Sequence, residues 1–218
     1  MDSGNIGFVL LCAAFVFVMT PGLAMFYGGL VRKKNVVNTM MTSIFIIGVG
    51  IVMWVLFGYS LSFAPSGNAF IGDFRWLGLE GVSLTEGYTD DASIPNMVFS
   101  AFQMMFAVIT PALITGAVAG RMKFKSIFVF TIFWSLIVYY PLAHMVWGQG
   151  GLLGADGIGA LDLAGGDVVH IRSGVSALVL CILLGKRHDY EHSIYRIHNI
   201  PTVVLGASLL MFGWFGFN

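Results

Sequence analysis

The sequence predicts an all-α integral membrane protein with six transmembrane helices. Hydrophobic residues make up 57% of the 218-residue chain, charged residues make up only 10%, and the mean hydropathy is +0.86. A soluble domain has about a quarter charged residues, so this composition implies that lipid surrounds most of the chain. Basic residues also gather in alternate links between the apolar segments, as expected of a multi-pass protein.

Each of the six apolar segments is long enough to cross a bilayer, which takes about 20 helical residues. We expect them at about 6–31, 37–63, 95–120, 126–147, 168–185 and 200–218, within a single transmembrane domain. The first begins without Lys or Arg, whereas a signal peptide has a positively charged start. It is therefore predicted to be a retained span, with an uncleaved signal-like start as the alternative.

Several segments contain small or helix-breaking residues that a membrane helix tolerates, beginning with Pro21 and Gly22 in the first. The third holds Pro111 and a GxxxG pattern from Gly116 to Gly120, and the sixth holds Gly206. The fifth opens with the ionisable pair of His170 and Arg172 within VVHIRSG. All six are consistent with closely packed spans.

Charge in the links predicts the orientation. The links after the first, third and fifth segments hold nine of the eleven basic residues, namely Arg32, Lys33, Lys34, Arg121, Lys123, Lys125, Lys186, Arg187 and Arg196. The opposite side holds most acidic residues and, of the basic ones, only Arg75 and Arg172. By the positive-inside rule, the basic links face the cytoplasm, and the N-terminus is predicted to lie on the outer side of the cytoplasmic (inner) membrane.

Composition also limits the function classes. The net charge is zero, so no basic field favours nucleic acid. The Gly-rich link 148–167 lacks a phosphate-binding signature and is predicted to be an ordered outer turn, whose acidic surroundings would concentrate cations. Cys12 and Cys181 lie in apolar runs and are predicted to be small buried hydrophobes, with no disulfide or metal site. We expect no cofactor.

Several aromatic residues and one histidine reach a similar depth in the outer half of the predicted bundle. Phe102 and Phe106 lie about 10 and 16 Å into the third segment and share one face. Trp147 and Phe217 end the fourth and sixth segments, and His170 lies about one turn into the fifth. Aromatic faces with an imidazole suit a small cation that can lose a proton.

Each of these residues has a structural alternative. Trp147 could be an interfacial anchor, and with 19 Phe in the chain most phenylalanines must serve helix packing. His170 could be a hydrogen-bonded packing residue, but an ionisable group inside a membrane favours a functional role.

The motifs PGLAMFYGGLVRKKN, AFQMMFAVITPALITGA, YYPLAHMVWGQGGLL, LDLAGGDVVHIRSG and GWFGFN follow one another along the chain. Together they resemble the Amt/Rh ammonium transporter family, of the microbial Amt type, over the whole chain. The resemblance implies a homotrimer with one narrow apolar path per subunit. It also implies eleven helices, an inverted five-plus-five repeat and a final helix, of which this chain supplies the first repeat and one further helix.

The resemblance also implies residue roles. Trp147 and Phe102 match aromatic residues that recruit ammonium at an outer vestibule, and Phe106 and Phe217 match a stacked gate pair. His170 matches the first of two histidines that line the lumen. Asp162 matches an acidic residue near the recruitment site, and we expect it to be anchored and to orient the entry of the fifth helix. Gln103 matches a family position without an assigned role.

This sequence departs from the family pattern in three respects. It stops before the serine that usually follows GWFGFN, and it lacks the second repeat with the second histidine, so we expect a fragment. Arg172 stands where a small or polar residue is expected. Because two residues span about 200° of a helix, Arg172 should face away from His170. We expect it to reach the outer interface and pair with an acidic group there or on another subunit, without lining the path.

The resemblance implies ammonium or ammonia conduction across the cytoplasmic membrane. The alternative is an ammonium sensor that signals through a domain beyond residue 218. Enzymatic activity is not expected, because no nucleophile–base arrangement or metal-ligand cluster occurs, and His188, His192 and His198 are predicted to be solvated loop residues. A PII-type signalling protein is an implied cytoplasmic partner.

Overall fold

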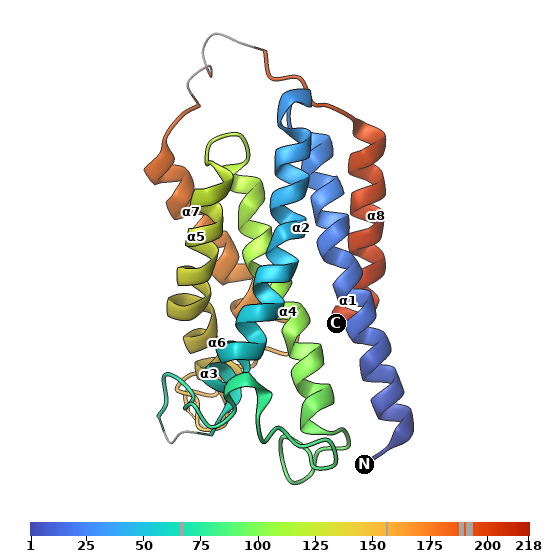
Figure 1. Cartoon of the computed structure of the whole chain (residues 1–218), viewed down its shortest axis with the longest axis vertical. Coiled ribbons are helices and arrows are strands. Elements are labelled where there is room, and N and C mark those ends of the chain that lie inside the picture. Colours follow the sequence, from blue (N-terminus) through green and yellow to red (C-terminus); the bar gives the residue numbers. More distant parts are fainter. Residues whose placement is uncertain (66–67, 156, 188–189, 191–193) are drawn as a thin grey trace.

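The computed structural model describes residues 1–65, 68–155, 157–187, 190 and 194–218, and within these ranges it contains helices and loops but no strand. Six helical spans are long and apolar enough to cross a membrane: Ser3–Leu30, Lys33–Phe63, Asn96–Val118, Phe124–Trp147, Gly166–Leu184 and Ile200–Phe217. Figure 1 shows them as elongated rods in one bundle. The prediction of an all-α chain with six spans is confirmed.

Three of the six spans are uniform α-helices and three contain a wider π-helical turn. The uniform spans are α1 (Ser3–Leu30), α4 (Asn96–Val118) and α8 (Ile200–Phe217). In the second span, the turn Trp54–Gly58 connects α2 (Val36–Met53) to α3 (Tyr59–Phe63). In the fourth, the turn Ser135–Tyr139 connects α5 (Phe124–Trp134) to α6 (Tyr140–Trp147). In the fifth, the turn Gly166–Ile171 precedes α7 (Arg172–Leu184). Such turns occur often at functional sites.

The π-helical turn Trp54–Gly58 lies against the start of α6 because a glycine leaves room. A Cβ atom on Gly58 would stand 2.6 Å from the ring of Tyr140. The Trp54 and Tyr140 rings also approach to 6.1 Å between centroids. The second and fourth spans are therefore joined by large aromatic side chains in the half of the bundle that carries the N-terminus.

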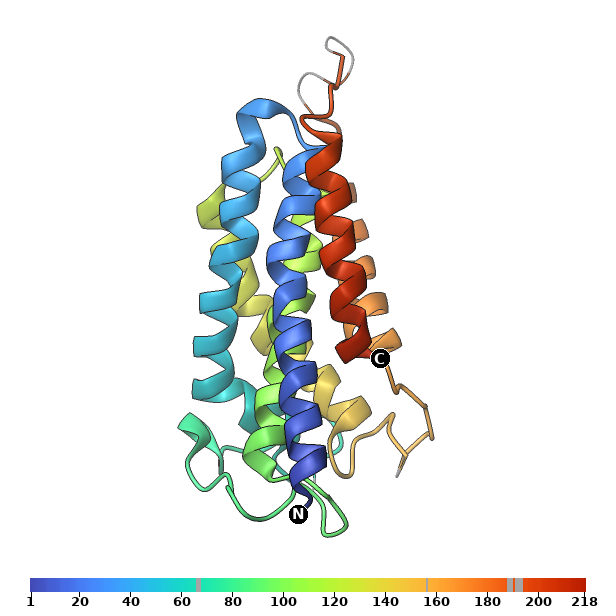
Figure 2. The ribbon, with the colours of Figure 1, turned by 90° about the vertical axis from the view of Figure 1, so that its right-hand side faces the viewer.

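Helices α1 and α8 run side by side, as Figures 1 and 2 both show. A Cβ atom on Gly206 would lie 2.3 Å from the backbone nitrogen of Phe26 and 2.6 Å from the Gly22 carbonyl oxygen. The two backbones thus meet in direct contact, the use of small residues that is typical of membrane helices.

The GxxxG pattern of α4 does not form a comparable pair. Gly116 faces the ring of Tyr27, which an added Cβ would approach to 2.4 Å, and the Tyr27 hydroxyl donates to the Leu113 carbonyl over 2.9 Å. Gly120 lies beyond the end of α4 with a φ of 71°, a conformation that glycine adopts readily at helix ends. Only the first glycine contributes to helix contact.

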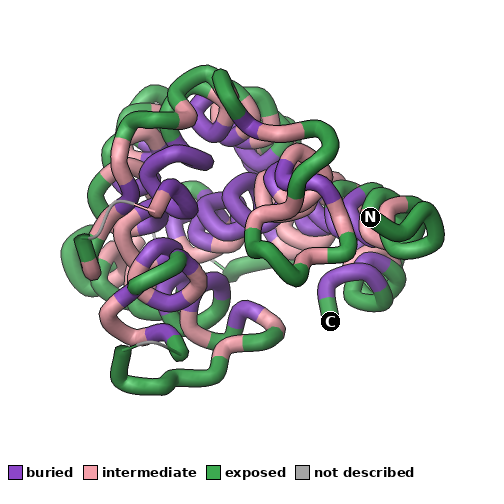
Figure 3. The backbone as a smooth tube through the Cα atoms, turned by 90° about the horizontal axis from the view of Figure 1, so that it is seen from below, coloured by how far each residue is buried: buried purple, intermediate pink, exposed green. Residues whose placement is uncertain are grey.

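The links alternate between the two ends of the bundle. The basic links after α1, α4 and α7 lie at the upper end of Figure 1, and the N-terminus lies at the lower end with the long links after α3 and α6. Viewed from the lower end, buried backbone occupies the interior and exposed backbone the periphery (Figure 3). Large apolar side chains stay exposed on the outer faces of α7 and α8, among them Leu183 and Phe215.

Candidate functional site

Aromatic residues from three spans meet in the half of the bundle that carries the N-terminus. The Phe102 and Phe106 rings of α4 are 4.9 Å apart between centroids, as their spacing predicts. Phe106 lies 4.7 Å from Phe217 of α8 and 6.0 Å from Trp147 of α6. The tertiary structure therefore places these four predicted residues in one cluster.

The Phe106 and Phe217 rings are inclined by 46°, so they are tilted against each other. This corrects the expectation of a stacked pair. The Phe217 ring also contacts the imidazole of His170, at 5.7 Å between centroids. Phe217 thus packs against both Phe106 and His170, inclined to each. Both phenylalanines are buried, with 4% of their surface exposed.

His170 lines an apolar cavity of about 320 Å³ beneath this cluster. The cavity is lined by Met19, Leu23, Phe26, Tyr27, Ile109, Leu113, Val169, His170, Ala207, Leu210, Trp214 and Phe217. The Tyr27 hydroxyl is occupied by its bond to the Leu113 carbonyl. The His170 imidazole is thus the ionisable group that this apolar lining presents.

Asp162 anchors the start of the fifth span. Its carboxylate accepts from the backbone N–H groups of Gly166 at 2.7 Å, Asp167 at 3.0 Å and Val168 at 2.9 Å. Gly165 enters this turn with a φ of 73°, which few other residues adopt without strain. A carboxylate at a helix start satisfies unpaired N–H groups and complements the helix dipole. The carboxylate thereby fixes the turn that presents His170.

Trp147 is tied to the same segment. Its indole Nε1–H donates to the Asp162 carbonyl oxygen over 2.7 Å. Because this bond uses the donor of Trp147, the ring face is what remains available to a ligand. Asp162 thus holds the helix start with its carboxylate and the tryptophan with its carbonyl. The roles of both residues in ammonium recruitment stay predictions.

Arg172 does not reach the outer interface. Only 4% of the residue is exposed, and its Nη1 donates to the Tyr139 carbonyl oxygen over 2.8 Å. The guanidinium carbon also lies 5.2 Å from the centroid of the Tyr139 ring. Within the described residues, Nε and Nη2 have no hydrogen-bond partner and no carboxylate forms an ion pair with the group.

The expected approach of Arg172 to the membrane surface is therefore wrong. Its side chain points into the contact between α7 and the π-helical turn Ser135–Tyr139, where the Tyr139 carbonyl is within reach. Pairing with an acidic group of another subunit stays a prediction. The expectation that Arg172 faces a neighbouring helix agrees with this position, and Arg172 is absent from the lining of the His170 cavity.

Sequence reasoning missed His144, which is fully buried in α6. Its Nδ1 lies 3.1 Å from the Ser62 carbonyl oxygen and its Nε2 2.9 Å from that of Asn68. A neutral imidazole has one N–H and can satisfy only one of these acceptors. The residue connects α6 to α3 and to the link that follows α3. Its position inside an apolar span was the signal that could have identified it.

The link after α3 also contains an ion pair between two neighbouring residues. The Arg75 guanidinium lies 2.7 Å from the Asp73 carboxylate, and its hydrogen bond lowers the pKa of Asp73 below the ordinary value. Asp73 therefore stays ionised in mildly acidic solution and adds negative charge to the end of the bundle that carries the N-terminus.

Other chemistry-bearing residues do not form a metal site. No group of three or more His, Cys, Asp or Glu side chains could hold a metal ion within the part of the chain that the structure describes. Cys181 is only partly buried and accepts a hydrogen bond from Arg121, which corrects its expected role as a buried hydrophobe. His198 is exposed, whereas His188 and His192 lie outside the described residues.

These features define a class: a multi-pass helical membrane protein with an aromatic cluster above an apolar, histidine-lined cavity. A sequence model of the Ammonium Transporter Family matches residues 7–218. The chain is 51% identical to an ammonium transporter of Bacillus subtilis (strain 168) and 40% identical to ammonium transporter Amt1 of Archaeoglobus fulgidus. Both matches cover all of this chain and 52% of the relative. The chain belongs to the Ammonium Transporter Family.

Solved structures show the same fold. The chain matches Candida albicans Mep2 with a TM-score of 0.88 at 34% identity, covering all of this chain and 48% of that one. A structure described as a sensor Amt protein matches 98% of this chain and 53% of its own, with a TM-score of 0.83 at 28% identity. The chain thus spans about half the length of the relatives it matches.

Proposed function

We propose that this chain forms part of a conduction path for ammonium and ammonia across the cytoplasmic membrane. The observation that carries this proposal is that Phe217 contacts both Phe106 and His170, and that Phe217 and His170 line one apolar cavity. Trp147 and Phe102 recruit the cation with their ring faces, which attract positive charge. Family membership supports the same substrate.

The apolar cavity then selects the neutral species. A charged group inside a membrane is costly, so ammonium transfers its proton to solvent water at the entrance, near the Phe106–Phe217 pair, and only neutral ammonia enters. The His170 imidazole exchanges hydrogen bonds with ammonia, because a neutral ring offers one donor and one acceptor. The tilted phenylalanines close the entrance and exclude water.

The test measures uptake of labelled methylammonium by cells that lack their own ammonium transporters and express the full-length protein. We expect His170→Ala to lower uptake about tenfold, since one lost hydrogen bond contributes about 1.4 kcal/mol. Phe217→Ala should also change flux. Phe215→Ala is its matched control, because Phe215 lies on the same helix but is exposed. Wild-type uptake by His170→Ala would exclude His170 from the mechanism.

We also propose a homotrimer with the N-terminus outside. The segregation of basic links at one end of the bundle supports this orientation, and the exposed apolar faces of α7 and α8 leave surface for further protein or lipid. A PII-type signalling protein on the cytoplasmic face is proposed from the family resemblance alone.

A second candidate function is ammonium sensing without conduction. It is favoured by the similarity to a structure described as a sensor Amt protein and by the positive charge of Arg172 in the span that carries His170. Currents recorded from the full-length protein in planar bilayers separate the two candidates. An ammonium-dependent current, or net ammonia flux into vesicles, would exclude a pure sensor.

A further inference from the structure

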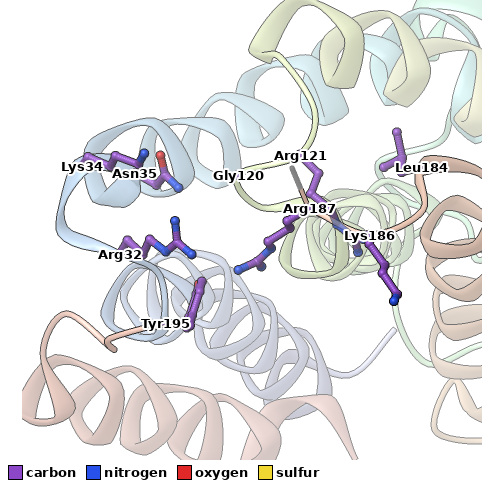
Figure 4. Close-up of a pocket in the computed structure, with 9 residues that line it drawn as sticks. All are labelled: Arg32, Lys34, Asn35, Gly120, Arg121, Leu184, Lys186, Arg187 and Tyr195. Atoms are coloured by element: carbon purple, nitrogen blue, oxygen red, sulfur yellow. The ribbon is translucent and has the colours of Figure 1, made fainter. Parts of the chain in front are cut away.

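The basic end of the bundle contains a second cavity, distinct from the one beside His170. It has a volume of about 380 Å³ and lies where the links after α1, α4 and α7 meet (Figure 4). Its lining consists of Arg32, Lys34, Asn35, Gly120, Arg121, Leu184, Lys186, Arg187 and Tyr195. Five of these nine residues are cationic, and they come from three separate links.

Arg121 is held in place by the ends of two helices. Its Nη1 donates to the Gly185 carbonyl over 3.0 Å, and its Nη2 donates to the Ala117 carbonyl and to the Cys181 sulfur. These bonds join the C-terminal ends of α4 and α7. The guanidinium is therefore fixed before any ligand arrives, which lowers the entropy lost on binding.

Arg32 and Arg187 extend toward each other on either side of Tyr195 (Figure 4). Their guanidinium carbons lie 5.0 and 4.5 Å from the centroid of the Tyr195 ring, so the two groups are less than about 10 Å apart. Arg187 also donates to the Ala119 carbonyl over 3.4 Å. Like charges at this separation repel each other, and an anion bound beside them would attract both.

The negative ends of the neighbouring helices balance only part of the positive charge in this cavity. Each helix C-terminus carries about half a negative charge, and three such ends, those of α1, α4 and α7, lie at the cavity. None of the lining residues that the structure describes is a carboxylate. Two carboxylates of the adjoining link, Asp189 and Glu191, lie outside the described residues. If both carboxylates and the three helix ends are counted in full, their negative charge still falls short of the five cationic side chains by more than one charge.

We propose that this cavity binds a phosphoryl-bearing anion. Guanidinium groups match phosphate oxygens with paired hydrogen bonds and are preferred where phosphate is recognised. A volume of this size lies in the usual range for small-ligand pockets. Two sources share this chemistry: a soluble phosphate compound and the headgroup of an anionic lipid in the adjacent leaflet, since basic pockets between membrane helices hold such headgroups.

The test uses the full-length protein in nanodiscs of phosphatidylcholine, titrated calorimetrically with inorganic pyrophosphate. We expect saturable binding that Arg187→Gln weakens at least tenfold. Lys125→Gln is the matched control, because it removes the same charge from the same end of the bundle and Lys125 does not line the cavity. We expect it to change the affinity less than twofold. Arg32→Gln provides a second cavity variant.

A second arm distinguishes the two sources. In nanodiscs that contain phosphatidylglycerol, a headgroup in the cavity should weaken pyrophosphate binding to the wild type, whereas a site for soluble anions should keep its affinity. Either result supports a phosphoryl site. Absence of pyrophosphate binding to folded wild-type protein in phosphatidylcholine would overturn the proposal, as would equal weakening by Lys125→Gln and Arg187→Gln. Neither result would bear on ammonium conduction.

Discussion

Arg172 carries a charge into the bundle interior with one carbonyl oxygen and one aromatic ring as its observed partners. Burial of a charge is unfavourable unless it is fully hydrogen-bonded, and two of the three guanidinium nitrogens have no partner within the described residues. Removing a buried charge of this kind is often neutral or stabilising, whereas breaking a buried ion pair is strongly destabilising. The stability of a variant therefore reports whether a carboxylate lies opposite.

We expect Arg172→Met to change the free energy of unfolding of the full-length protein by less than about 1 kcal/mol, because the lost bond to Tyr139 is offset by the removed charge. Unfolding in mixed micelles with increasing SDS measures this difference. Arg172→Lys is the comparison, since it keeps the charge with a different donor geometry, and it should be less stable than the Met variant. A loss of about 3–5 kcal/mol in Arg172→Met would instead indicate a carboxylate partner from outside this chain.

Among the elements, the contact between α1 and α8 depends on glycine. The backbones meet where Gly206 faces Phe26 and Gly22, within an extensive contact between the two helices. Because α8 carries Phe217, the same contact sets the distance between Phe217 and Phe106. Local helix packing thus determines the geometry of the proposed gate.

A side chain at Gly206 should separate the two helices. We expect Gly206→Ala to lower the free energy of unfolding by about 1–3 kcal/mol, because an added methyl group overpacks the contact, and to lower methylammonium uptake. Gly48→Ala is the control: nothing lies within 4 Å of its added Cβ, and alanine favours a helix. It should be neutral or slightly stabilising. Equal destabilisation by both variants would contradict a specific role for Gly206.

Over the whole molecule, charge is divided between the two ends of the bundle. Nine of the eleven basic residues follow the first, third and fifth spans, and the links after α1, α4 and α7 lie at one end (Figure 1). This division supports the proposed orientation and also concentrates the cations that form the second cavity. One feature of the sequence thus bears on both topology and ligand binding.

The orientation can be tested with single cysteines in a Cys12→Ala, Cys181→Ala background. Thr85 is exposed in the link after α3 and Lys125 is exposed in the first turn of α5, at opposite ends of the bundle. A membrane-impermeant maleimide should label Thr85→Cys in intact cells, and should label Lys125→Cys only after permeabilisation. The reverse pattern would place the N-terminus in the cytoplasm.

The sequence by itself determined the class of protein, the six spans and their alternation. These properties depend on composition and on link charge, which act locally on each segment. The sequence also indicated that Phe102 and Phe106 share a face, because helix periodicity sets that relation. Its motifs marked Trp147, Phe217 and His170 through a family resemblance.

Only the tertiary structure decided how these residues meet. The tilt of Phe217 against Phe106, the burial of Arg172 beside Tyr139 and the anchoring of His144 depend on contacts between spans distant in sequence. Periodicity gives the face of a helix but not the rotation or depth of its neighbour. The π-helical turns add to this, because each changes the rotation of the span that follows. The same interhelical packing brings Arg32, Arg121 and Arg187 around one cavity.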